Sequence, residues 1–353
     1  MIKILVINIG STSTKVGLFF DHDPVFKETR DHSSEDLSRL HGYDEWLRFH
    51  QTNVDNVLGP HGDMLEGLGL VVSRGGLTRP VEGGGYRINE EMLHDLRSGE
   101  YGWHPCNVGP AIASGIATKY RVGAIVFDTP VTDELAPIAR FSGLKGVKRE
   151  SGFHVLNQKS AGRKAARDLS IPYEQAHFIV AHLGGGITVG AHMKGRIIDG
   201  THGLSEGPFT PQRTGALPLK KIIELCFSGR YSKDELVHML FGQGGVFSYL
   251  GTYNIEAVEK RVTGGDQEAL LVLQAIAYQI AKEIAAMAAV LKGRVDAVVL
   301  TGNLCNARTV VEEIKNRVSF IGEVCVYPGE DELENLASGG FVILSMGKRA
   351  KEY

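Results

Sequence analysis

The sequence has few cysteines and no spacing that would join them into a site. Its four cysteines, Cys106, Cys226, Cys305 and Cys325, are scattered over 353 residues without a Cys-x-x-Cys pair. This pattern excludes a disulfide framework and a cysteine-based zinc site, and it favours a reducing compartment.

An excess of charge of one sign is also missing, as is a long uncharged apolar run. The chain has 38 Lys and Arg against 41 Asp and Glu, so we expect no nucleic-acid partner, which would require a basic surface. No run of about 18 apolar residues lacks polar or charged interruptions. The longest apolar region, 269–291, carries Lys282 and Glu283. We therefore expect a buried helix there, no membrane span and, without a leader pattern at the start, a cytoplasmic protein.

What the chain does have is length and an internal resemblance between its two halves. With 353 residues, 43% of them hydrophobic, it is too long for one ordinary core and predicts two domains. Each half begins with an apolar run, a glycine-containing turn and a second apolar run, at 3–8, 10–14 and 15–20 and at 178–183, 184–186 and 187–191. Both segments predict a strand, a hairpin, a strand, a tight turn and a third strand.

Later parts of the halves also correspond. A helical segment precedes an apolar strand twice, at 109–119 and 124–127 and again at 267–292 and 297–300. The repeat predicts two similar mixed α/β domains, with ligands in the cleft between them. We place the domains at 1–149 and 150–332, and we expect a C-terminal helix at 333–353 to complete the first. Residues 30–50, rich in His, Ser and charge, predict a solvated insertion with a short helix.

Two familiar phosphate-binding patterns fail in the glycine turns. Residues 10–15 lack the second glycine of a Walker loop and lead into a strand rather than a helix. The glycines at 184–186 are followed by β-branched residues that are poor at opening the helix of a dinucleotide fold. Hairpin turns of Gly, Ser and Thr could still present amides and hydroxyls to phosphate, although each turn alone could be an ordinary hairpin.

Three motifs together resemble one family. Residues 8–15 (Asn-Ile-Gly-Ser-Thr-Ser-Thr-Lys), 126–129 (Val-Phe-Asp-Thr) and 182–186 (His-Leu-Gly-Gly-Gly) resemble, in order and spacing, the signatures of the acetate/butyrate kinase family. That family belongs to the superfamily of actin-like and sugar-kinase folds. Four further stretches, 74–77, 153–159, 206–211 and 327–332, resemble the butyrate kinases in particular. The resemblance covers nearly the whole chain.

The resemblance implies a fold and a reaction. The fold is two duplicated actin-like (ribonuclease H-like) domains, each a mixed five-stranded sheet flanked by helices, with an interdomain cleft. The reaction is the ATP-dependent phosphorylation of a short-chain fatty acid, butanoate + ATP = butanoyl phosphate + ADP, by direct in-line transfer. The implied cofactors are ATP/ADP and Mg²⁺, the partners are a short-chain carboxylate or its acyl phosphate, and the assembly is a homodimer or larger homo-oligomer.

The resemblance also implies roles for individual residues. The residues expected to act in catalysis are Asn8, Arg74, His104, Asp128, His154 and Arg213. Those expected to bind the nucleotide are Ser11, Thr12, Lys15, His182, Gly184, Gly185, Gly186, Gly302 and Asn303. Those expected to hold the metal are Asn8, Asp128, Asp331 and Glu332. In these roles Arg74 and Arg213 flank the transferring phosphoryl group, His104 binds the substrate carboxylate and His154 stabilises the phosphoryl group.

These residue types suit the chemistry. Phosphoryl transfer needs positioning and positive charge around the phosphate oxygens, which forked guanidinium donors supply. Magnesium prefers hard oxygen ligands, so one or two carboxylates are enough. A carboxylate substrate is already a nucleophile, and it needs no general base.

Other functions remain open from the sequence. The same machinery would serve an acetate, propionate or isobutyrate kinase. A sugar kinase would need a base for its hydroxyl nucleophile. A non-catalytic actin-like nucleotide-binding module would have no use for four residues together, Arg74, Arg213, His104 and His154. We hypothesise that Gly76 leaves room for a longer alkyl chain, beside Trp103, Phe153 and Leu204. Gly302 and Asn303 stand in a segment that departs from the family's usual Gly-Gly-Ile.

Overall fold

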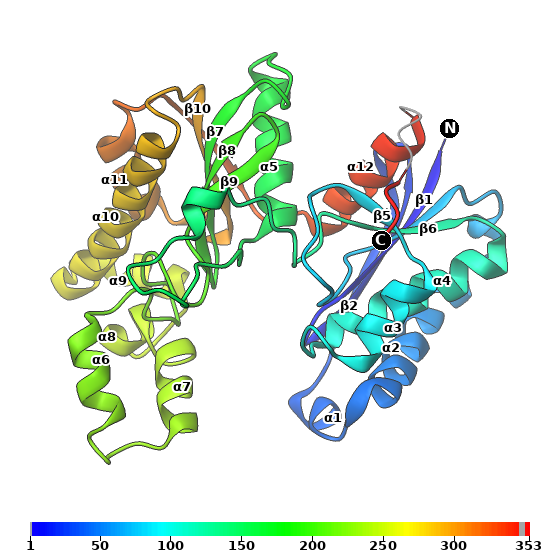
Figure 1. Ribbon diagram of the computed structural model, residues 1–353, viewed down its shortest axis with the longest axis horizontal. Helices are drawn as coiled ribbons and strands as arrows, with labels where there is room; N and C mark the ends of the chain where they lie inside the picture. Colours follow the sequence, from blue (N-terminus) through cyan, green and yellow to red (C-terminus); the bar gives the residue numbers. More distant parts are fainter. Residues whose placement is uncertain (1, 346–349) are drawn as a thin grey trace. The chain divides into compact units, whose positions relative to one another are not determined.

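The protein contains two compact units, each a mixed β-sheet flanked by helices (Figure 1). A computed structural model describes residues 2–345 and 350–353. The first unit comprises Met1–Asp133 and Asp331–Tyr353, and the second comprises Glu134–Glu330. The chain thus leaves the first unit, builds the whole of the second and returns to the first.

The two sheets share one strand order. The first sheet runs β3-β2-β1-β4-β6-β5 and contains β1 (Lys3–Ile9), β2 (Ser13–Phe20), β3 (Asp23–Asp31), β4 (Leu70–Ser73), β5 (Gly85–Arg87) and β6 (Gly123–Phe127). The second runs β11-β10-β7-β8-β9 and contains β7 (His177–Leu183), β8 (Ile187–Met193), β9 (Arg196–Gly200), β10 (Ala297–Gly302) and β11 (Glu323–Pro328). In each, an antiparallel three-strand meander adjoins parallel strands.

This order confirms the predicted duplicated actin-like fold, with two corrections. The first sheet has six strands rather than five, because β5 pairs antiparallel with β6 at the edge. The predicted correspondence of 124–127 with 297–300 is wrong, because β4 occupies the position of β10 and β6 that of β11. Both 124–127 and 297–300 follow a helix and have the continuous apolar pattern of a buried parallel strand. That local pattern does not distinguish the third parallel strand of the sheet from the second.

The helices cover both faces of each sheet. In the first unit they are α1 (Ser34–Ser38), α2 (Gly42–Leu58), α3 (Glu90–Ser98), α4 (Gly109–Tyr120) and α12 (Glu332–Ser345), with 3₁₀ turns η1 (Gly59–Leu65) and η2 (Pro105–Val108). In the second they are α5 (Val155–Asp168), α6 (Leu219–Cys226), α7 (Lys233–Phe241), α8 (Gly245–Leu250), α9 (Ile255–Thr263), α10 (Gln267–Val290) and α11 (Arg308–Val318), with η3 (Pro137–Arg140) and η4 (Asn303–Asn306).

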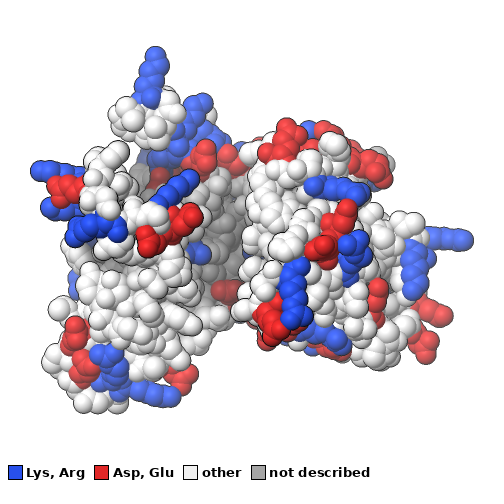
Figure 2. Space-filling model, turned by 90° about the horizontal axis from the view of Figure 1, so that it is seen from below, with Lys and Arg blue, Asp and Glu red and all other residues white. Residues whose placement is uncertain are grey.

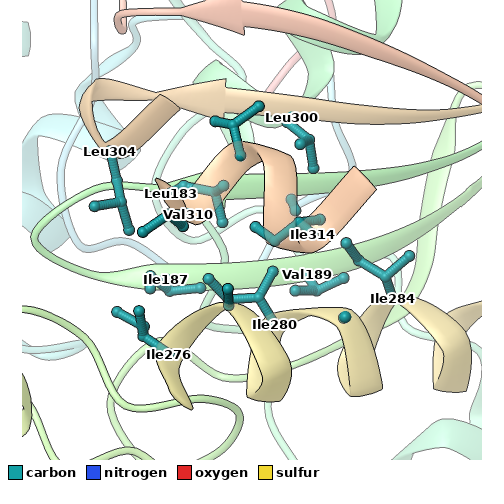
Figure 3. Packing of buried hydrophobic residues seen from close by; sticks show 14 of the residues in the cluster. Leu183, Ile187, Val189, Ile276, Ile280, Ile284, Leu300, Leu304, Val310 and Ile314 are labelled. Carbon is teal, nitrogen blue, oxygen red and sulfur yellow. The ribbon is translucent and has the colours of Figure 1, made fainter. Parts of the chain in front are cut away.

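The core of the second unit follows from alternation along its strands. Ile179, Ala181 and Leu183 of β7 face α10 and α11, while Phe178 and Val180 face α5. Figure 3 shows the first of these two faces, where Leu183 packs with Val310 and Ile314 of α11. Helix α10, predicted as a buried helix, packs Ile276, Ile280 and Ile284 into this core. Among the described residues, α10 alone is long and apolar enough to cross a membrane by length and composition. Buried core helices meet the same criterion.

The first unit uses its last helix to cover one face of its sheet. Leu5 and Ile7 of β1 pack with α2 and α4 on one side, and α12 contacts β1, β4 and β6 on the other. The predicted solvated insertion at 30–50 is therefore only partly correct. Residues 34–38 form an exposed short helix, but α2 begins at Gly42, and within the predicted insertion Trp46 and Leu47 pack against the core and His50 is fully buried.

Residues 134–149 belong to the second unit by their contacts. The Lys159 ammonium lies 2.8 Å from the buried Glu134 carboxylate, and the backbone N–H of Ala136 donates to Ile198. Arg149 pairs with both Asp199 and Glu206 at 2.9 Å. The predicted domain limit at 149/150 therefore falls inside this unit, and the limit at 332 falls two residues after its end. Of the segment predicted as a helix at 333–353, residues 346–349 lie outside the described part of the chain, as does Met1.

The contact between α12 and the first sheet gives a test with opposite signs at two helical glycines. A Cβ on Gly339 of α12 would lie 2.4 Å from the Phe127 ring, whereas one on Gly115 of α4 would meet nothing within 4 Å. We expect Gly339→Ala to destabilise the protein by about 1–3 kcal/mol through overpacking. We expect Gly115→Ala to stabilise it by about 0.5–1 kcal/mol through helix propensity. Urea denaturation measures both, and a Gly339→Ala protein as stable as the parent would contradict this packing.

Candidate active site

Three predicted residues of the first unit stand at the same edge of its sheet. Strands β1, β4 and β6 are parallel neighbours, with Ile7 opposite Ser73 and Ser73 opposite Val126. Asn8 near the end of β1, Arg74 just after β4 and Asp128 just after β6 therefore follow neighbouring carboxyl ends. This is the edge at which open α/β sheets place ligands.

The Glu332 carboxylate is the centre of this group. Its Oε2 accepts from Asn8 Nδ2 and from Lys15 Nζ, each at 2.8 Å, and Arg74 Nη1 lies 3.5 Å from its Oε1. Burial alone would raise the pKa of Glu332, but Arg74, Lys15 and Asn8 together outweigh burial and lower it below its usual value. The carboxylate is therefore ionised at neutral pH, and the cluster carries two cations around one anion.

Asn8 presents an oxygen atom that the protein itself does not use. The side chain is buried and its Nδ2 is committed to Glu332, while its Oδ1 has no hydrogen-bond partner among the described residues. A buried amide oxygen without a partner is costly, so a donor or a cation is expected beside it. No group of three or more His, Cys, Asp or Glu side chains in the described ranges could hold a metal alone, so an ion here would rely on Asn8 and Glu332 with water.

His104 lies near Arg74, one of these two cations. The backbone N–H of Cys106 donates to His104 Nδ1 at 3.2 Å, so the proton of the neutral ring is on Nε2. Burial, and secondly the charge of Arg74, lower the pKa of His104. The ring is therefore a neutral hydrogen-bond donor at physiological pH, near an arginine that can bind an anion.

The other predicted residues of the first unit have distinct positions. Asp128 is buried with a φ of +43°, and its Oδ1 accepts from the backbone of Gly84 at 2.8 Å. Ser11 and Thr12 are exposed in the β1–β2 turn. Asp331 is exposed and acts electrostatically on Lys27 of β3. The predicted acidic pair thus diverges, since only Glu332 joins the cluster with Asn8.

A second group surrounds the glycine turn between β7 and β8. A Cβ on Gly186 would lie 2.6 Å from Arg213 Nη1 and 3.0 Å from His154 Cε1. The His154 and His182 rings are stacked with centroids 4.0 Å apart, and Arg213 also donates to the carbonyl of Gly203. A side chain at Gly186 would have to displace the Arg213 guanidinium and would crowd His154, so the turn brings its backbone to within contact of a histidine and an arginine.

The sequence did not point to the residues that support His182. Its Nδ1 lies 2.7 Å from Asn157 Oδ1, and its Nε2 lies 3.7 Å from the Glu330 carboxylate. Burial, and secondly His154, lower the pKa of His182 well below its usual value. Asn157 falls in the 153–159 stretch and Glu330 in the 327–332 stretch, so the resemblance contained the signal but assigned no role to either residue.

Gly302 and Asn303 lie at the end of β10, the neighbour of β7. Gly302 has a φ of +97°, and a Cβ there would lie 2.3 Å from the carbonyl oxygen of Leu183. Its position therefore requires glycine for both conformation and space. Asn303 begins η4 with an exposed side chain, so it is available to a ligand near the 184–186 turn.

The hypothesis that Gly76 opens an alkyl pocket is wrong. A Cβ on Gly76 would lie 2.7 Å from Asn107 and from Leu96, so the space is already filled by buried neighbours. Phe153 is a core residue, whereas Trp103 and Leu204 are exposed. A small residue is compatible with an open pocket or with close packing, and at Gly76 the structure shows close packing.

Each unit therefore holds one cluster: Asn8, Lys15, Arg74, His104 and Glu332 in the first, and His154, His182, Arg213 and the turn 184–186 in the second. Both combine cationic or hydrogen-bond-donating groups with exposed backbone, which is suited to phosphate and carboxylate oxygens. Away from them, Lys and Arg are interspersed with Asp and Glu on the face drawn in Figure 2, in agreement with the nearly balanced composition.

Comparison with solved structures shows the same architecture in kinases of short carboxylates. An acetate kinase from Porphyromonas gingivalis matches with a TM-score of 0.76 and 19% identity, over 98% of this chain and 100% of that one. A propionate kinase from Francisella tularensis matches with a TM-score of 0.72 and 19% identity, over 96% and 99%. An acetate kinase from Entamoeba histolytica matches with a TM-score of 0.76 and 16% identity, over 97% and 100%. At these identities the likeness concerns the fold.

The sequence itself also matches a family. Residues 122–343, well over half of the chain, match the model of the acetokinase family. The matched region includes Asp128, His154, His182, Arg213 and Glu332, which the two clusters contain or adjoin. The chain belongs to the acetokinase family.

Proposed function

We propose that this protein is a butyrate kinase, which transfers the γ-phosphoryl group of ATP directly to butanoate and so forms butanoyl phosphate and ADP. Family membership accounts for the coarser statement, that the chain is a kinase acting on a short-chain carboxylate. The preference for butanoate rests on the four stretches that resemble butyrate kinases, at 74–77, 153–159, 206–211 and 327–332.

The observation that carries the proposal is the convergence of Asn8, Lys15 and Arg74 on the Glu332 carboxylate. Arg74 and Lys15 supply the positive charge that phosphoryl transfer requires. His104 supplies a neutral donor beside Arg74. A substrate carboxylate bound between such groups attacks without a base, which explains why no histidine near the cluster needs to be basic.

The residues around Asn8 fit a magnesium ion. The unpartnered Asn8 Oδ1 and the Glu332 carboxylate are hard oxygen donors side by side. A bound magnesium would neutralise charge on the phosphates of the nucleotide. Lys15 and Arg74 keep Glu332 ionised, and Asn8 keeps it in place. We assign Asp128 a role in the same site through water, and we leave Asp331 outside it.

In the second unit we assign the 184–186 turn, Gly302 and Asn303 to the nucleotide. Arg213 and His154 lie against that turn, so they would contact the phosphates of the bound nucleotide. A module that only bound nucleotide would have no use for Arg74, His104 and Arg213 together. We place the activity in the cytoplasm, because all four cysteines are free thiols.

A series of acids tests the substrate. With Mg-ATP and hydroxylamine, we expect hydroxamate to form fastest from butyrate or isobutyrate. Each buried methylene contributes about 0.8 kcal/mol, so butyrate should exceed acetate in kcat/KM by roughly tenfold. A maximum at acetate or propionate would retain the carboxylate kinase and remove the butyrate assignment. Absence of any hydroxamate, with ATP binding confirmed, would contradict the proposed reaction.

Replacement of Arg74 tests the first cluster. We expect Arg74→Ala to lower kcat by about 10³-fold, equivalent to roughly 4 kcal/mol of transition-state stabilisation. Arg74→Lys should recover only part of this, because an ammonium lacks the forked donors. Arg87→Ala is the matched control, since Arg87 is an exposed arginine of the same unit, 3.4 Å from Glu352. Equal activity of the Arg74 and Arg87 variants would show that Arg74 does not contact the phosphoryl group.

We also propose that the protein forms a homodimer through helix α6. Leu219, Ile223 and Phe227 are 79%, 58% and 86% exposed and, four residues apart, they share one face. If two copies pack antiparallel about a two-fold axis, Ile223 meets its equivalent and Leu219 meets Phe227 of the second copy. The same arrangement brings Lys220 beside Glu224 of the second copy, so the face complements itself in charge.

Sedimentation equilibrium tests this assembly. We expect Ile223→Glu to produce monomers at micromolar concentration, because two like charges would meet at the axis. Val237→Glu on α7 replaces a residue of similar exposure and should leave the dimer intact. A monomeric parent protein, or a dimer unaffected by Ile223→Glu, would rule out α6 as the interface.

A further inference from the structure

A continuous row of hydrogen bonds runs through the second unit to His154. His154 Nδ1 lies 3.0 Å from Thr188 Oγ1, which lies 2.6 Å from Gln158 Nε2. Gln158 Oε1 lies 3.0 Å from His192 Nε2, and His192 Nδ1 lies 2.8 Å from the Tyr173 hydroxyl. Thr188, Gln158 and His192 are fully buried. Burying such a row is costly unless each of its donors faces an acceptor, so the partners show which atoms carry the protons.

Helix and strand periodicity place these residues opposite one another. His154 is the N-cap residue of α5 and Gln158 follows it by four residues, so both lie on one side of the first turn of the helix. Thr188, Gly190 and His192 alternate along β8 and share one face. A Cβ on Gly190 would lie 2.4 Å from Gln158 Oε1. Because Gly190 has no side chain, the Gln158 amide can pack directly against the backbone of β8.

The carbonyl group of Thr188 fixes the direction of the row. Gln158 Nε2 lies 3.3 Å from that carbonyl oxygen, which can only accept. The amide nitrogen of Gln158 must therefore face Thr188, and its oxygen must face His192. His192 consequently carries its proton on Nε2, and its Nδ1 accepts from the Tyr173 hydroxyl.

The same reasoning determines the proton of His154. Thr188 Oγ1 accepts from Gln158 Nε2 and, at 3.5 Å, from the backbone N–H of His154. Its own proton is then directed to His154 Nδ1, which accepts it. The neutral His154 ring therefore carries its proton on Nε2. That edge of the ring faces Gly186, where a Cβ would lie 3.0 Å from Cε1 and 3.2 Å from Nε2.

The charged and titratable groups around His154 come from several elements. His182 of β7 stacks on its ring at 4.0 Å, and the Arg213 guanidinium approaches the same Gly186. The Glu330 carboxylate lies 3.7 Å from His182 Nε2, and His202 lies against Gly152. A proton on His154 Nδ1 would require the Thr188 hydroxyl to abandon its acceptor, and the charge would meet Arg213.

We propose that Thr188 and Gln158 are positioning residues that hold His154 as a neutral imidazole with its N–H directed at the 184–186 turn. In the proposed kinase, on which this inference rests for the identity of the acceptor, that N–H donates to an oxygen of the transferring phosphoryl group. His154 neither gives nor takes a proton in this role. It supplies a hydrogen bond that strengthens as charge develops on the oxygen.

Nitrogen-15 NMR of histidine-labelled protein tests the proposal without turnover. The His154 signals are identified by their loss in His154→Gln and followed between pH 5 and 9. In the parent protein and in Thr188→Ser we expect the Nε2–H tautomer. In Thr188→Val, which removes the hydroxyl at nearly constant volume, we expect a mixture of tautomers and a titration midpoint raised by about one pH unit.

Gln158→Glu is expected to reverse the direction of the hydrogen bond between residue 158 and Thr188. An ionised carboxylate only accepts, so the Thr188 hydroxyl should donate to it and His154 should change to the Nδ1–H tautomer. Tyr173→Phe is the matched control, because the Thr188 carbonyl rather than Tyr173 fixes the direction of the Gln158 amide, and it should leave His154 unchanged. An Nδ1–H tautomer in the parent protein, or one tautomer in all variants, would overturn the proposal.

Kinetics separates positioning from a structural role. With the acid that the substrate series selects, we expect Thr188→Val to lower kcat by about tenfold or more. The KM values should change little, and Thr188→Ser should restore kcat. A loss that appears only in KM, or that Thr188→Ser does not repair, would contradict the assigned role. If the chain proved not to be a kinase, the NMR result would still decide which tautomer the row imposes.

Discussion

A carboxylate removed from water needs positive charge beside it, and the first unit is organised around that requirement at Glu332. The charges and donors come from four places in the chain: Asn8 on β1, Lys15 on β2, Arg74 after β4 and Glu332 itself at the start of α12. Each must be in register for the ion pairs to form, because an ion left unpaired there would cost several kcal/mol. The hydrophobic packing of α2, α4 and α12 fixes the sheet, and the sheet fixes the charges. The site thus depends on the fold for its geometry, and the fold must accommodate a charged group that contributes little to stability by itself.

The second unit solves a related problem with neutral groups. Its strand order repeats that of the first unit, but the groups beside its glycine turn include two stacked histidines, and burial of one of them, His182, disfavours a positive charge on that ring. Here the orientation of the two rings is controlled rather than their charge. Asn157 forms a hydrogen bond with Nδ1 of His182, and Thr188 forms one with Nδ1 of His154. The duplicated scaffold therefore carries two kinds of polar site, an ionic one and one built from directed hydrogen bonds.

The sequence predicted most of the architecture because both hairpins and the long helix α10 have strong local patterns. It failed where a local pattern is shared by two topological positions, as for 124–127 and 297–300, and where exposed-looking residues precede an amphipathic helix, as for α2. Motif order predicted Asn8, Lys15 and Arg74, which the structure brings together on Glu332. It could not separate Asp331 from Glu332, since adjacent residues point in different directions only once the backbone is known. Gln158 falls in the 153–159 stretch, but the resemblance assigned it no role, and its relation to Thr188 and Gly190 arises between a helix and a strand that are distant in sequence.

The return of the chain to the first unit has a consequence for its synthesis. Residues 1–133 contain all six strands of the first sheet, but the helix that covers one of its faces, α12, ends only at Ser345. At about 5–20 residues per second, a ribosome needs roughly 10–40 s to make the intervening second unit and α12. Throughout that interval the nascent sheet has Ile4, Val6 and Val72 without the helix that later buries them, and Glu332 is added only near its end. The first half of the polypeptide is therefore the last part of the protein to be completed.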